Sequence, residues 1–354
     1  MPRDRSRLAR LAGALLLGAA GVAACADAEA SADPVAVEVA FLTPSDSLDD
    51  VDSPAAWRAP DGSVHLFATA KGTHVLLHYD GVTGRLLGRV AGEGSGPGEL
   101  RRPNGVFVHD DLLIVVERDN RRVQVLDLPD LRPLGSFGDD VLLKPYGISA
   151  VPADGGLDLW ITDDFDVTGV DGAEWTARIK RFRLERRGEG IEATFLGAFG
   201  EAEGPGRLTV VESILADDAQ ARLLVADEDE AHRNLKIYDL EGRFTGEVAA
   251  SGVFAAEPEG LALYRCGPDG YIVSADQSRG ANRFHVLDRD SLERLGTFVL
   301  NGVANTDGVA LLQASAGAAT ESWFYAVHDD QAVGGVRWSD VAEALGLRSD
   351  CAVP

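Results

Sequence analysis

The sequence predicts an all-β protein, a six-bladed β-propeller of four-stranded antiparallel blades that is closed by a strand from the amino terminus. Three observations support this prediction. A strand–turn–strand phrase recurs along the chain, segments with alternating apolar residues stand before each copy, and the copies are spaced like the blades of a propeller. In such a ring, side chains on different blades can meet at the centre although they are far apart in the sequence.

The recurring phrase is an apolar run, a polar turn and a second short run that ends in glycine. It occupies residues 75–88, 123–135, 235–246 and 284–296, and a fainter copy lies at 179–197. The closing glycines are 47 to 62 residues apart. Each copy is therefore predicted to form the outer hairpin of one blade.

Two further alternating segments stand before each hairpin and are expected to form the inner strands of the blade. Examples are residues 105–108 with 112–116, and 260–263 with 271–274. This pattern assigns five blades.

A sixth blade begins with residues 308–312 and 323–327 but is too short to be complete. We expect residues 35–42 to supply its missing strand. Residues 338–345 are expected to form one short helix, and residues 35–354 to be a single propeller domain.

The amino terminus is predicted to be a signal peptide followed by a lipidated tether. Four arginines precede an apolar run at 11–24 that is too short to span a membrane as a mature helix. Residues 22–25 resemble a bacterial lipobox, so we expect a signal peptide at 1–24, a lipid on Cys25 and a tether over 25–34. The alternative is an ordinary secreted protein, cleaved near Ala24 or Ala30. The expected location is extracytoplasmic: a membrane-anchored lipoprotein of the periplasm or cell surface, otherwise a secreted protein.

Two cysteines remain in the body, Cys266 and Cys351. In an oxidising compartment they could form a disulfide that fixes the C-terminal tail to the domain. The sequence alone leaves open whether they pair.

The chain is strongly acidic, with 57 Asp and Glu against 33 Lys and Arg and a formal net charge of −24. This charge argues against nucleic acid and anionic membrane surfaces as partners. Bound divalent cations would relieve the self-repulsion of such a protein. We expect a monomer whose membrane contact is the lipid on Cys25.

Seven possible oxygen donors lie just before or just after predicted strands: Tyr146, Glu212, Glu228, Glu257, Glu259, Gln277 and Asp307. Hard cations such as Ca²⁺ bind about six to eight oxygen ligands, and the histidines show no metal-ligand spacing. Glu257 and Glu259 flank Pro258, where two nearby carboxylates repel each other unless a cation lies between them. The pattern predicts a calcium site if the fold brings these residues together.

Several segments follow one another in a characteristic order. Residues 52–57 read Asp-Ser-Pro-Ala-Ala-Trp. Glu212 begins the acidic stretch 212–218, and Glu228 lies within the acidic stretch 224–231. Glu-Pro-Glu-Gly-Leu, Ser-Ala-Asp-Gln-Ser and Thr-Asp-Gly-Val follow at 257–261, 274–278 and 306–309. In order and spacing these segments resemble the β-propeller phytases, calcium-dependent phosphatases that hydrolyse myo-inositol hexakisphosphate. The resemblance runs, with gaps, over nearly the whole mature chain.

The resemblance implies a role for each matching residue. The calcium ligands would be the seven donors named above, with Glu212, Glu228 and Asp307 at the catalytic centre, and Lys71 and Arg118 would bind substrate phosphate. Several Ca²⁺ ions would hold the phosphate oxygens and lower the pKa of a bound water that attacks phosphorus in line. The implied partner is a small phosphorylated substrate, and the implied activity is that of a calcium-dependent phosphomonoester hydrolase.

The chain also departs from the family pattern. Ser53 stands where the family has its second opening Asp, residues 39–44 lack an expected glutamate, and the basic pair expected before Glu212 is reduced to Arg207. Fewer cations would hold highly charged phytate less strongly, so a smaller phosphoester could be the substrate.

A second resemblance supports an alternative function. Residues 92–105 with 116–126 are similar to an NHL repeat, and 200–206 with 235–240 echo it. Such propellers mostly bind ligands or proteins rather than catalyse. In that case Arg118 and Asn120 would be blade-turn residues and the acids ordinary polar groups between strands. Taken singly, Lys71 could also be a surface lysine, Glu228 part of a solvated loop and Asp307 a turn cap.

Overall fold

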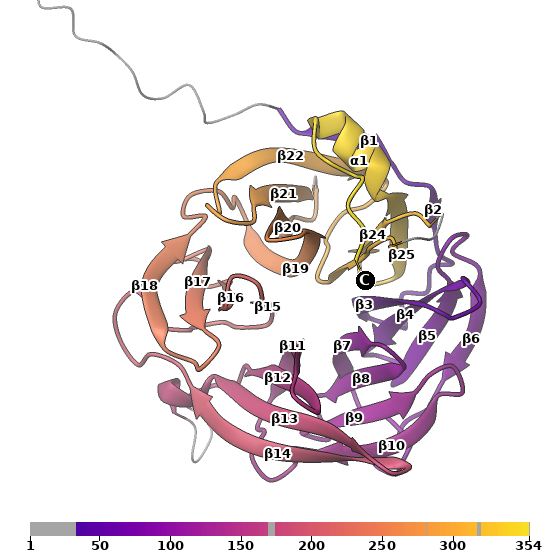
Figure 1. Cartoon of the computed structure of the whole chain (residues 1–354), viewed down its shortest axis with the longest axis vertical. Coiled ribbons are helices and arrows are strands. Elements are labelled where there is room, and N and C mark those ends of the chain that lie inside the picture. The colour runs from indigo at the N-terminus through magenta and orange to yellow at the C-terminus, as the bar shows by residue number, and fades with distance from the viewer. Residues whose placement is uncertain (1–32, 169–173, 281, 317–319, 354) are drawn as a thin grey trace, which may run out of the picture. The chain divides into compact units, whose positions relative to one another are not determined.

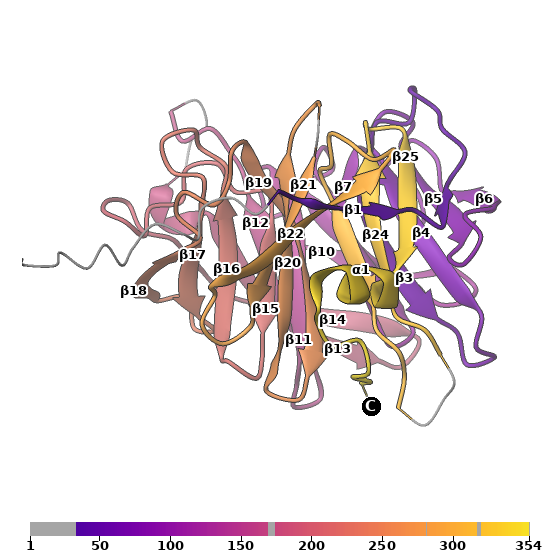
Figure 2. The same cartoon turned by 90° about the horizontal axis from the view of Figure 1, so that it is seen from above.

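A computed structural model of the chain describes residues 33–168, 174–280, 282–316 and 320–353. These residues form a six-bladed β-propeller with four-stranded antiparallel blades (Figures 1 and 2), as the repeats predict. The predicted signal peptide, Cys25 and all but the last two residues of the tether lie outside the described residues. Asp33–Pro354 forms one compact unit.

Each blade runs outward from the axis of the ring in chain order. The first three blades consist of β3 (Val51–Arg58), β4 (Val64–Ala70), β5 (Val75–Asp80) and β6 (Leu86–Val90); β7 (Pro103–His109), β8 (Leu112–Glu117), β9 (Arg122–Asp127) and β10 (Arg132–Phe137); and β11 (Pro145–Ala153), β12 (Gly156–Asp163), β13 (Ile179–Arg187) and β14 (Gly190–Phe199). A 3-10 helix, η1 (Trp175–Ala177), stands before β13.

The remaining blades repeat this order. They consist of β15 (Ile214–Asp217), β16 (Arg222–Asp227), β17 (Asn234–Asp239) and β18 (Phe244–Ala249); β19 (Glu257–Cys266), β20 (Asp269–Gln277), β21 (Arg283–Asp288) and β22 (Arg294–Asn301); and β23 (Val309–Leu312), β24 (Trp323–His328) and β25 (Ala332–Arg337).

The amino-terminal segment closes the ring, as predicted. Strand β2 (Phe41–Leu42) pairs with β25 and is the outer strand of the sixth blade. Strand β1 (Val35–Glu38) pairs in parallel with β22 and adds a fifth strand to the fifth blade. The sequence pattern did not predict this parallel pairing. Together the two strands tie the start of the chain to its last two blades.

The repeated glycine marks an irregularity in the outer strand of the blade. In the second blade the register between β9 and β10 shifts at Gly135, whose φ is 153°. In the third blade it shifts beside Gly197, whose φ is 137°. Glycine adopts such backbone angles without steric cost, so a β-bulge can form at each point.

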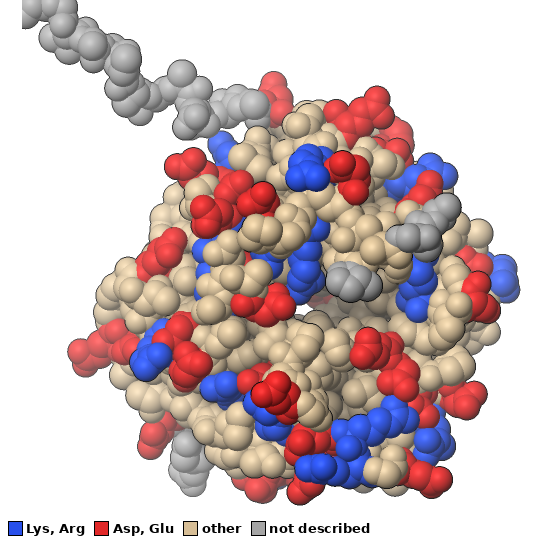
Figure 3. Space-filling view, viewed as in Figure 1, with Lys and Arg blue, Asp and Glu red and all other residues tan. Residues whose placement is uncertain are grey.

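The apolar core is divided among the blade interfaces. Strand β8 is apolar along nearly its whole length, with Leu113 and Val115 in the cluster against the first blade and Ile114 and Val116 in the cluster against the third. Side chains of a strand alternate between its two faces, so each central strand contributes to two interfaces. This arrangement leaves the axis free of a packed core, and Figure 3 shows the molecule hollowed at its centre.

The carboxyl terminus is fixed to the fifth and sixth blades. Helix α1 (Trp338–Leu345) forms as predicted and buries Trp338 and Val341 between these blades. It ends at Gly346, whose φ of 68° is typical of a glycine C-cap. A disulfide joins Cys266 to Cys351, which resolves the open question about the two thiols. Within the described residues, no helix has the length and apolar character needed to cross a membrane.

Candidate metal centre

Six side chains form a ring at one mouth of the central channel, one from the start of the innermost strand of each blade. The first residue of this mouth ring is on the first blade and the last is on the sixth: Asp52, Asn104, Tyr146, Glu212, Glu259 and Asp307. In each blade the next residue is glycine or serine, and eleven of these twelve residues, all except Asn104, line one narrow cavity. Four of the six ring positions are therefore carboxylates at a single mouth.

The glycines that follow the mouth-ring residues let adjacent blades approach closely. A Cβ atom on Gly147 would lie 2.0 Å from the backbone oxygen of Glu212, and one on Gly260 would lie 2.7 Å from the backbone nitrogen of Val309. A side chain at either position would push the neighbouring blade away. The small residue thus brings ring side chains from successive blades together.

A second set of acids near the mouth is structural. Asp163 at the end of β12 accepts hydrogen bonds from the backbone N–H groups of Leu143 and Lys144, and its other contact is the ammonium of Lys180 at 2.7 Å. Asp276 does the same for the loop before β19. Glu117 and Asp227 occupy the equivalent positions of the second and fourth blades. These carboxylates hold the loop that leads into each inner strand.

The residue after each structural acid lies beside the mouth ring. At this position the second to fifth blades carry Arg118, Asp164, Glu228 and Gln277, and the first blade carries Lys71 after Ala70. The acidic run at 227–230 is thus divided by function: Asp227 is structural and Glu228 is available to the mouth.

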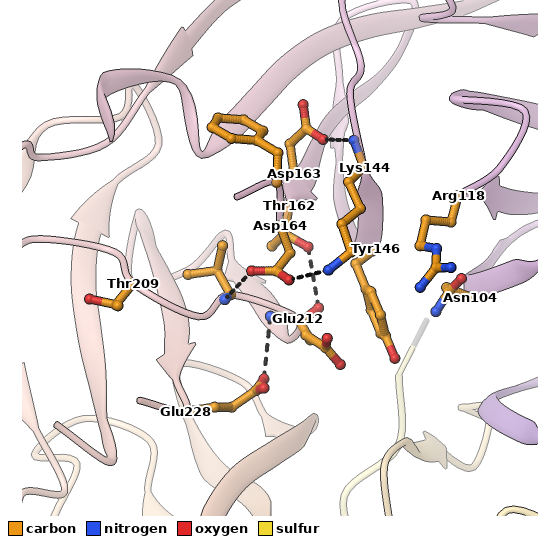
Figure 4. Close-up of polar contacts among 12 residues, drawn as sticks. Asn104, Arg118, Lys144, Tyr146, Thr162, Asp163, Asp164, Thr209, Glu212 and Glu228 are labelled. Atoms are coloured by element: carbon orange, nitrogen blue, oxygen red, sulfur yellow. Dashed lines mark hydrogen bonds and ion pairs between the residues drawn. The ribbon is translucent and has the colours of Figure 1, made fainter. Parts of the chain in front are cut away.

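Three carboxylates form the centre of the site. Oxygen atoms of Glu212, Glu228 and Glu259 lie within 4.8 Å of one another, and the side chains of Glu228 and Glu259 are buried. Figure 4 shows Glu228 facing the loop that carries Glu212, whose backbone N–H donates to Glu228 at 3.3 Å. The three residues line a cavity of about 450 Å³. We refer to them as the carboxylate centre.

The pKa values at the carboxylate centre are those of acids that are buried close to one another. Burial and the charge of Asp52 raise the pKa of Glu212 to about 7. Burial and the charge of Glu212 raise the pKa of Glu228 well above its usual value, and burial and the charge of Glu228 do the same to the pKa of Glu259. Burial and Asp52 raise the pKa of Asp307 to about 8. A bound cation would stabilise the charged carboxylates and lower these pKa values.

The donor set fits a hard divalent cation. The carboxylate centre and Asp307 line the cavity with carboxylates, and Gln277 adds an amide. Carboxylate and amide oxygens are the ligands that Ca²⁺ prefers. Gln277 donates its amide N–H to Asp307, so these two residues are already held together. The seven predicted donors are not equally placed, however.

Two predicted donors lie apart from the carboxylate centre. Glu257 lines the same cavity but is exposed at its rim, whereas Glu259 is buried. The phenol of Tyr146 donates to Asp52 at 2.8 Å, and burial and Asp52 raise its pKa well above the usual value. Figure 4 shows the Tyr146 ring beside Glu212.

Lys71 is buried among acids, so its assignment as a surface lysine is wrong. Its ammonium lies 2.8 Å from Asp52, 3.4 Å from Asp307 and 3.5 Å from Asp50. Burial alone would lower the pKa of Lys71, but the charges of Asp52 and Asp307 outweigh it and raise that pKa. The positive charge at this mouth is therefore already shared among three carboxylates.

Arg118 lies at the mouth without lining the cavity. Its guanidinium forms an ion pair with Asp119 at 3.0 Å, and Figure 4 shows it beside Asn104. Asn120 donates to the carbonyl of Gly94 and to Glu117, as a blade-turn residue would. The guanidinium carbon of Arg207 lies 4.0 Å from the centre of the Trp175 ring.

Sequence reasoning missed three residues of the site, which are Asp52, Asn104 and Asp164. Asp52 opens the motif at 52–57, which by itself indicates no role for it, although Asp52 contacts both Lys71 and Tyr146. Asn104 is fully buried, and its side-chain oxygen has no partner among the described residues. The available signal was the repeated pair of a polar residue followed by Gly or Ser at the start of each inner strand.

Comparisons with known proteins give one family match over part of the chain and likenesses of fold. Residues 207–347 match the family model described as Phytase, a segment that holds every predicted donor except Tyr146. Hydrazine synthase of Kuenenia stuttgartiensis is 14% identical over 82% of this chain and 96% of that chain, with a TM-score of 0.52. A chain of a nidogen/laminin complex is 13% identical over 72% and 86%, with a TM-score of 0.49. At such identity the hydrazine synthase likeness shows the propeller fold alone. None of the curated proteins matches the chain.

Proposed function

We propose that this chain, a phytase-like β-propeller, is a calcium-dependent phosphomonoester hydrolase that acts on phytate or a related phosphoester at the channel mouth. The observation that carries the proposal is the carboxylate centre. Buried carboxylates whose oxygens approach within 4.8 Å of one another are costly unless a cation compensates them. The family match covers the same residues.

The chain offers the ligands for such a cation. Glu212, Glu228 and Glu259 would hold it from two blades, and Asp307 and Gln277 line the same cavity. Bound calcium supplies positive charge to phosphate oxygens and makes a water molecule more acidic. In this proposal Glu257 and Tyr146 complete the donor set from the rim and from the third blade.

The chain's own residues would orient the phosphate and limit its charge. Lys71 keeps Asp52 and Asp307 compensated, so it would place an ammonium beside the phosphate as part of a lysine–aspartate group. Arg118 would contact a phosphate oxygen or a second anionic group only after leaving Asp119. Few cations at the mouth are free, which favours a phosphoester less charged than phytate.

A second candidate function, a non-catalytic propeller that binds a ligand or protein, is favoured by one observation. Arg118 begins the turn after β8, and its backbone carbonyl accepts from the N–H of Arg121. Together with the turn role of Asn120, this matches what the NHL-like alternative predicts for the segment. In that case calcium at the carboxylate centre would stabilise a binding surface.

Phosphate release separates the two functions. Purified protein should release phosphate from phytate, or from simpler phosphomonoesters, in the presence of Ca²⁺ and lose this activity with EDTA. The activity should return when excess Ca²⁺ is added. A folded, calcium-binding protein that releases no phosphate across a panel of phosphoesters would favour the binding alternative.

Location and attachment are separate proposals. We infer a lipid on Cys25 and a site of action in the periplasm or at the cell surface, with the propeller acting as a monomer. The Cys266–Cys351 disulfide supports an oxidising compartment. Mass spectrometry of the membrane-extracted protein would test the inference, since an unmodified chain that begins after residue 30 would contradict it.

A further inference from the structure

Two histidines of the first blade face each other away from the mouth ring. His65 is on β4 and His78 is on β5, neighbouring strands in Figure 1. In the register of these strands His78 lies opposite Phe67, so His65 and His78 are diagonal neighbours on one face. The Nδ1 atom of His65 lies 2.8 Å from the Nε2 atom of His78. Both side chains are partly buried.

Aromatic rings hold the two imidazoles in place. The ring of Trp57 packs against His65 with centroids 5.3 Å apart, and the ring of Phe67 stacks on His78 at 4.6 Å. Both aromatic residues belong to the apolar cluster between the first and second blades. The orientation of the imidazole pair is therefore set by packing.

A hydrogen-bonded relay fixes the tautomer of His65. Hydrogen bonds from Ser63 lower the pKa of the Asp61 carboxyl, so Asp61 is an acceptor. The Ser63 hydroxyl donates to Asp61 at 2.6 Å, which leaves its oxygen to accept from Nε2–H of His65 at 3.0 Å. The proton of His65 is thus on Nε2, and its Nδ1 lone pair points at His78.

His78 can present a second lone pair at the same place. The Nε2 atom of His78 is the ring nitrogen that lies against Nδ1 of His65. Without a metal, Nε2–H of His78 donates to Nδ1 of His65. No described residue forms a hydrogen bond with Nδ1 of His78, so the single proton of this ring can occupy that atom instead. The tautomer shift frees Nε2 and requires no net loss of a proton.

We propose that His65 and His78 form a second metal site, for a borderline divalent transition-metal ion such as Cu²⁺, Ni²⁺ or Zn²⁺, with solvent as the remaining ligands. Imidazole nitrogen suits these ions, whereas carboxylate oxygens suit Ca²⁺ and Mg²⁺. Through Ser63, Asp61 holds Nε2 of His65 by a hydrogen bond, and such a bond orients the ring of a ligating histidine. The site shares no residue with the carboxylate centre and does not depend on the proposed hydrolase activity.

Copper titration tests the proposal. Untagged protein in millimolar Ca²⁺ should bind one Cu²⁺ per chain at this site, and the electron paramagnetic resonance spectrum should show nitrogen hyperfine splitting. His65→Gln and His78→Gln should each weaken binding at least tenfold. His109→Gln, at a partly exposed histidine on the second blade, should bind Cu²⁺ like the wild type.

A second measurement, made on the wild-type protein, tests the site even if a histidine variant fails to fold. Cu²⁺ bound to His65 should quench the fluorescence of Trp57 in the wild-type protein, and Trp57→Phe should remove that part of the quenching. Oxygen-only ligation in the copper spectrum, or equal Cu²⁺ affinity in folded His65→Gln and His78→Gln variants, would overturn the proposal. So would quenching that is unchanged in Trp57→Phe.

Discussion

The ammonium nitrogen of Lys71 lies 3.4 Å from a carboxylate oxygen of Asp307, a residue 236 positions later in the chain. Lys71 follows the second strand of the first blade, and Asp307 precedes the first strand of the last. The contact therefore joins the two blades between which the ring closes. It also joins a cation expected to bind phosphate to a carboxylate expected to bind metal, so the two roles belong to one hydrogen-bonded group.

Lys71→Met should destabilise the metal-free protein strongly. The substitution keeps an unbranched side chain, shorter by the terminal nitrogen, but leaves Asp52 and Asp307 without their shared cation. Breaking a buried ion pair by removing one partner costs about 3–5 kcal/mol. Urea unfolding in EDTA should show a loss of this size, and added Ca²⁺ should recover part of it by compensating the same carboxylates.

Lys144→Met is the matched control. Lys144 pairs with Asp164 at 2.8 Å, but its side chain is 41% exposed. Exposed ion pairs contribute about 0–1 kcal/mol, so this variant should unfold within that range of the wild type. Equal losses in the two lysine variants would show that the burial of Lys71 among three acids has no energetic consequence.

Glu228→Gln should remove both the calcium response and the phosphate release. The change deletes one charge from the carboxylate centre and keeps the shape of the side chain. We expect the rise in melting temperature on adding Ca²⁺ to be lost, and activity to fall about 100-fold or more, as for loss of a key electrostatic contact. Asp307→Asn should act in the same direction.

Glu93→Gln serves as the control for Glu228→Gln. Glu93 is 63% exposed, and its contact with Arg101 is 4.0 Å long. It should keep the calcium response and the activity of the wild type. If Glu228→Gln retained its calcium-dependent rise in melting temperature, the carboxylate centre would not be the calcium site.

The blades were predictable because their signals are local. Period-two alternation, the glycine at the bulge and the spacing of the hairpins each lie within one blade. The missing outer strand of the sixth blade was also predictable, because a ring must close. The parallel pairing of β1 with β22 had no local signal, since it depends on where the closing strand crosses the fifth blade.

The carboxylate centre was only partly predictable for a related reason. Glu212, Glu228 and Glu259 stand at strand ends, where the sequence can place them. The state of Lys71 depends on Asp52 and Asp307, and the three come together only when the first and last blades meet. Asn104 was missed because a single Asn-Gly pair normally indicates a turn. Its role appears only when the six inner strands are compared.

The stability of the metal-free protein should rise as the pH falls from 8 to about 5. The pKa values of Glu212 and Asp307 are raised to about 7 and about 8 in the folded chain, from ordinary values of 4.5 and 3.8. Between these limits the folded state binds protons that the unfolded state has released. Unfolding free energy therefore falls as the pH rises through this window, and urea midpoints in EDTA should show it.

The acidic chain as a whole could produce a change of the same sign, because its net charge also grows with pH. The double variant Glu212→Gln with Asp307→Asn separates the two causes: its metal-free stability should vary less between pH 5 and 8 than that of the wild type. With saturating Ca²⁺ the wild-type trend should weaken, since the cation competes with protons for the same oxygens. A metal-free wild type that is more stable at pH 8 than at pH 5.5 would contradict the assignment.

Removal of the disulfide should lower stability without changing the metal centre. Cys266 is the last residue of β19, whereas Glu257 and Glu259 are at the opposite end of the same strand. The bridge closes a loop with a sequence separation of 85, for which a loss of about 2–4 kcal/mol is expected. The double variant Cys266→Ser with Cys351→Ser should show this loss in urea and keep the wild-type calcium response. Reductant should lower the unfolding free energy of the wild type to that of the variant and leave the variant unchanged. Loss of the calcium response in the variant would instead mean that the disulfide supports the mouth ring through the length of β19.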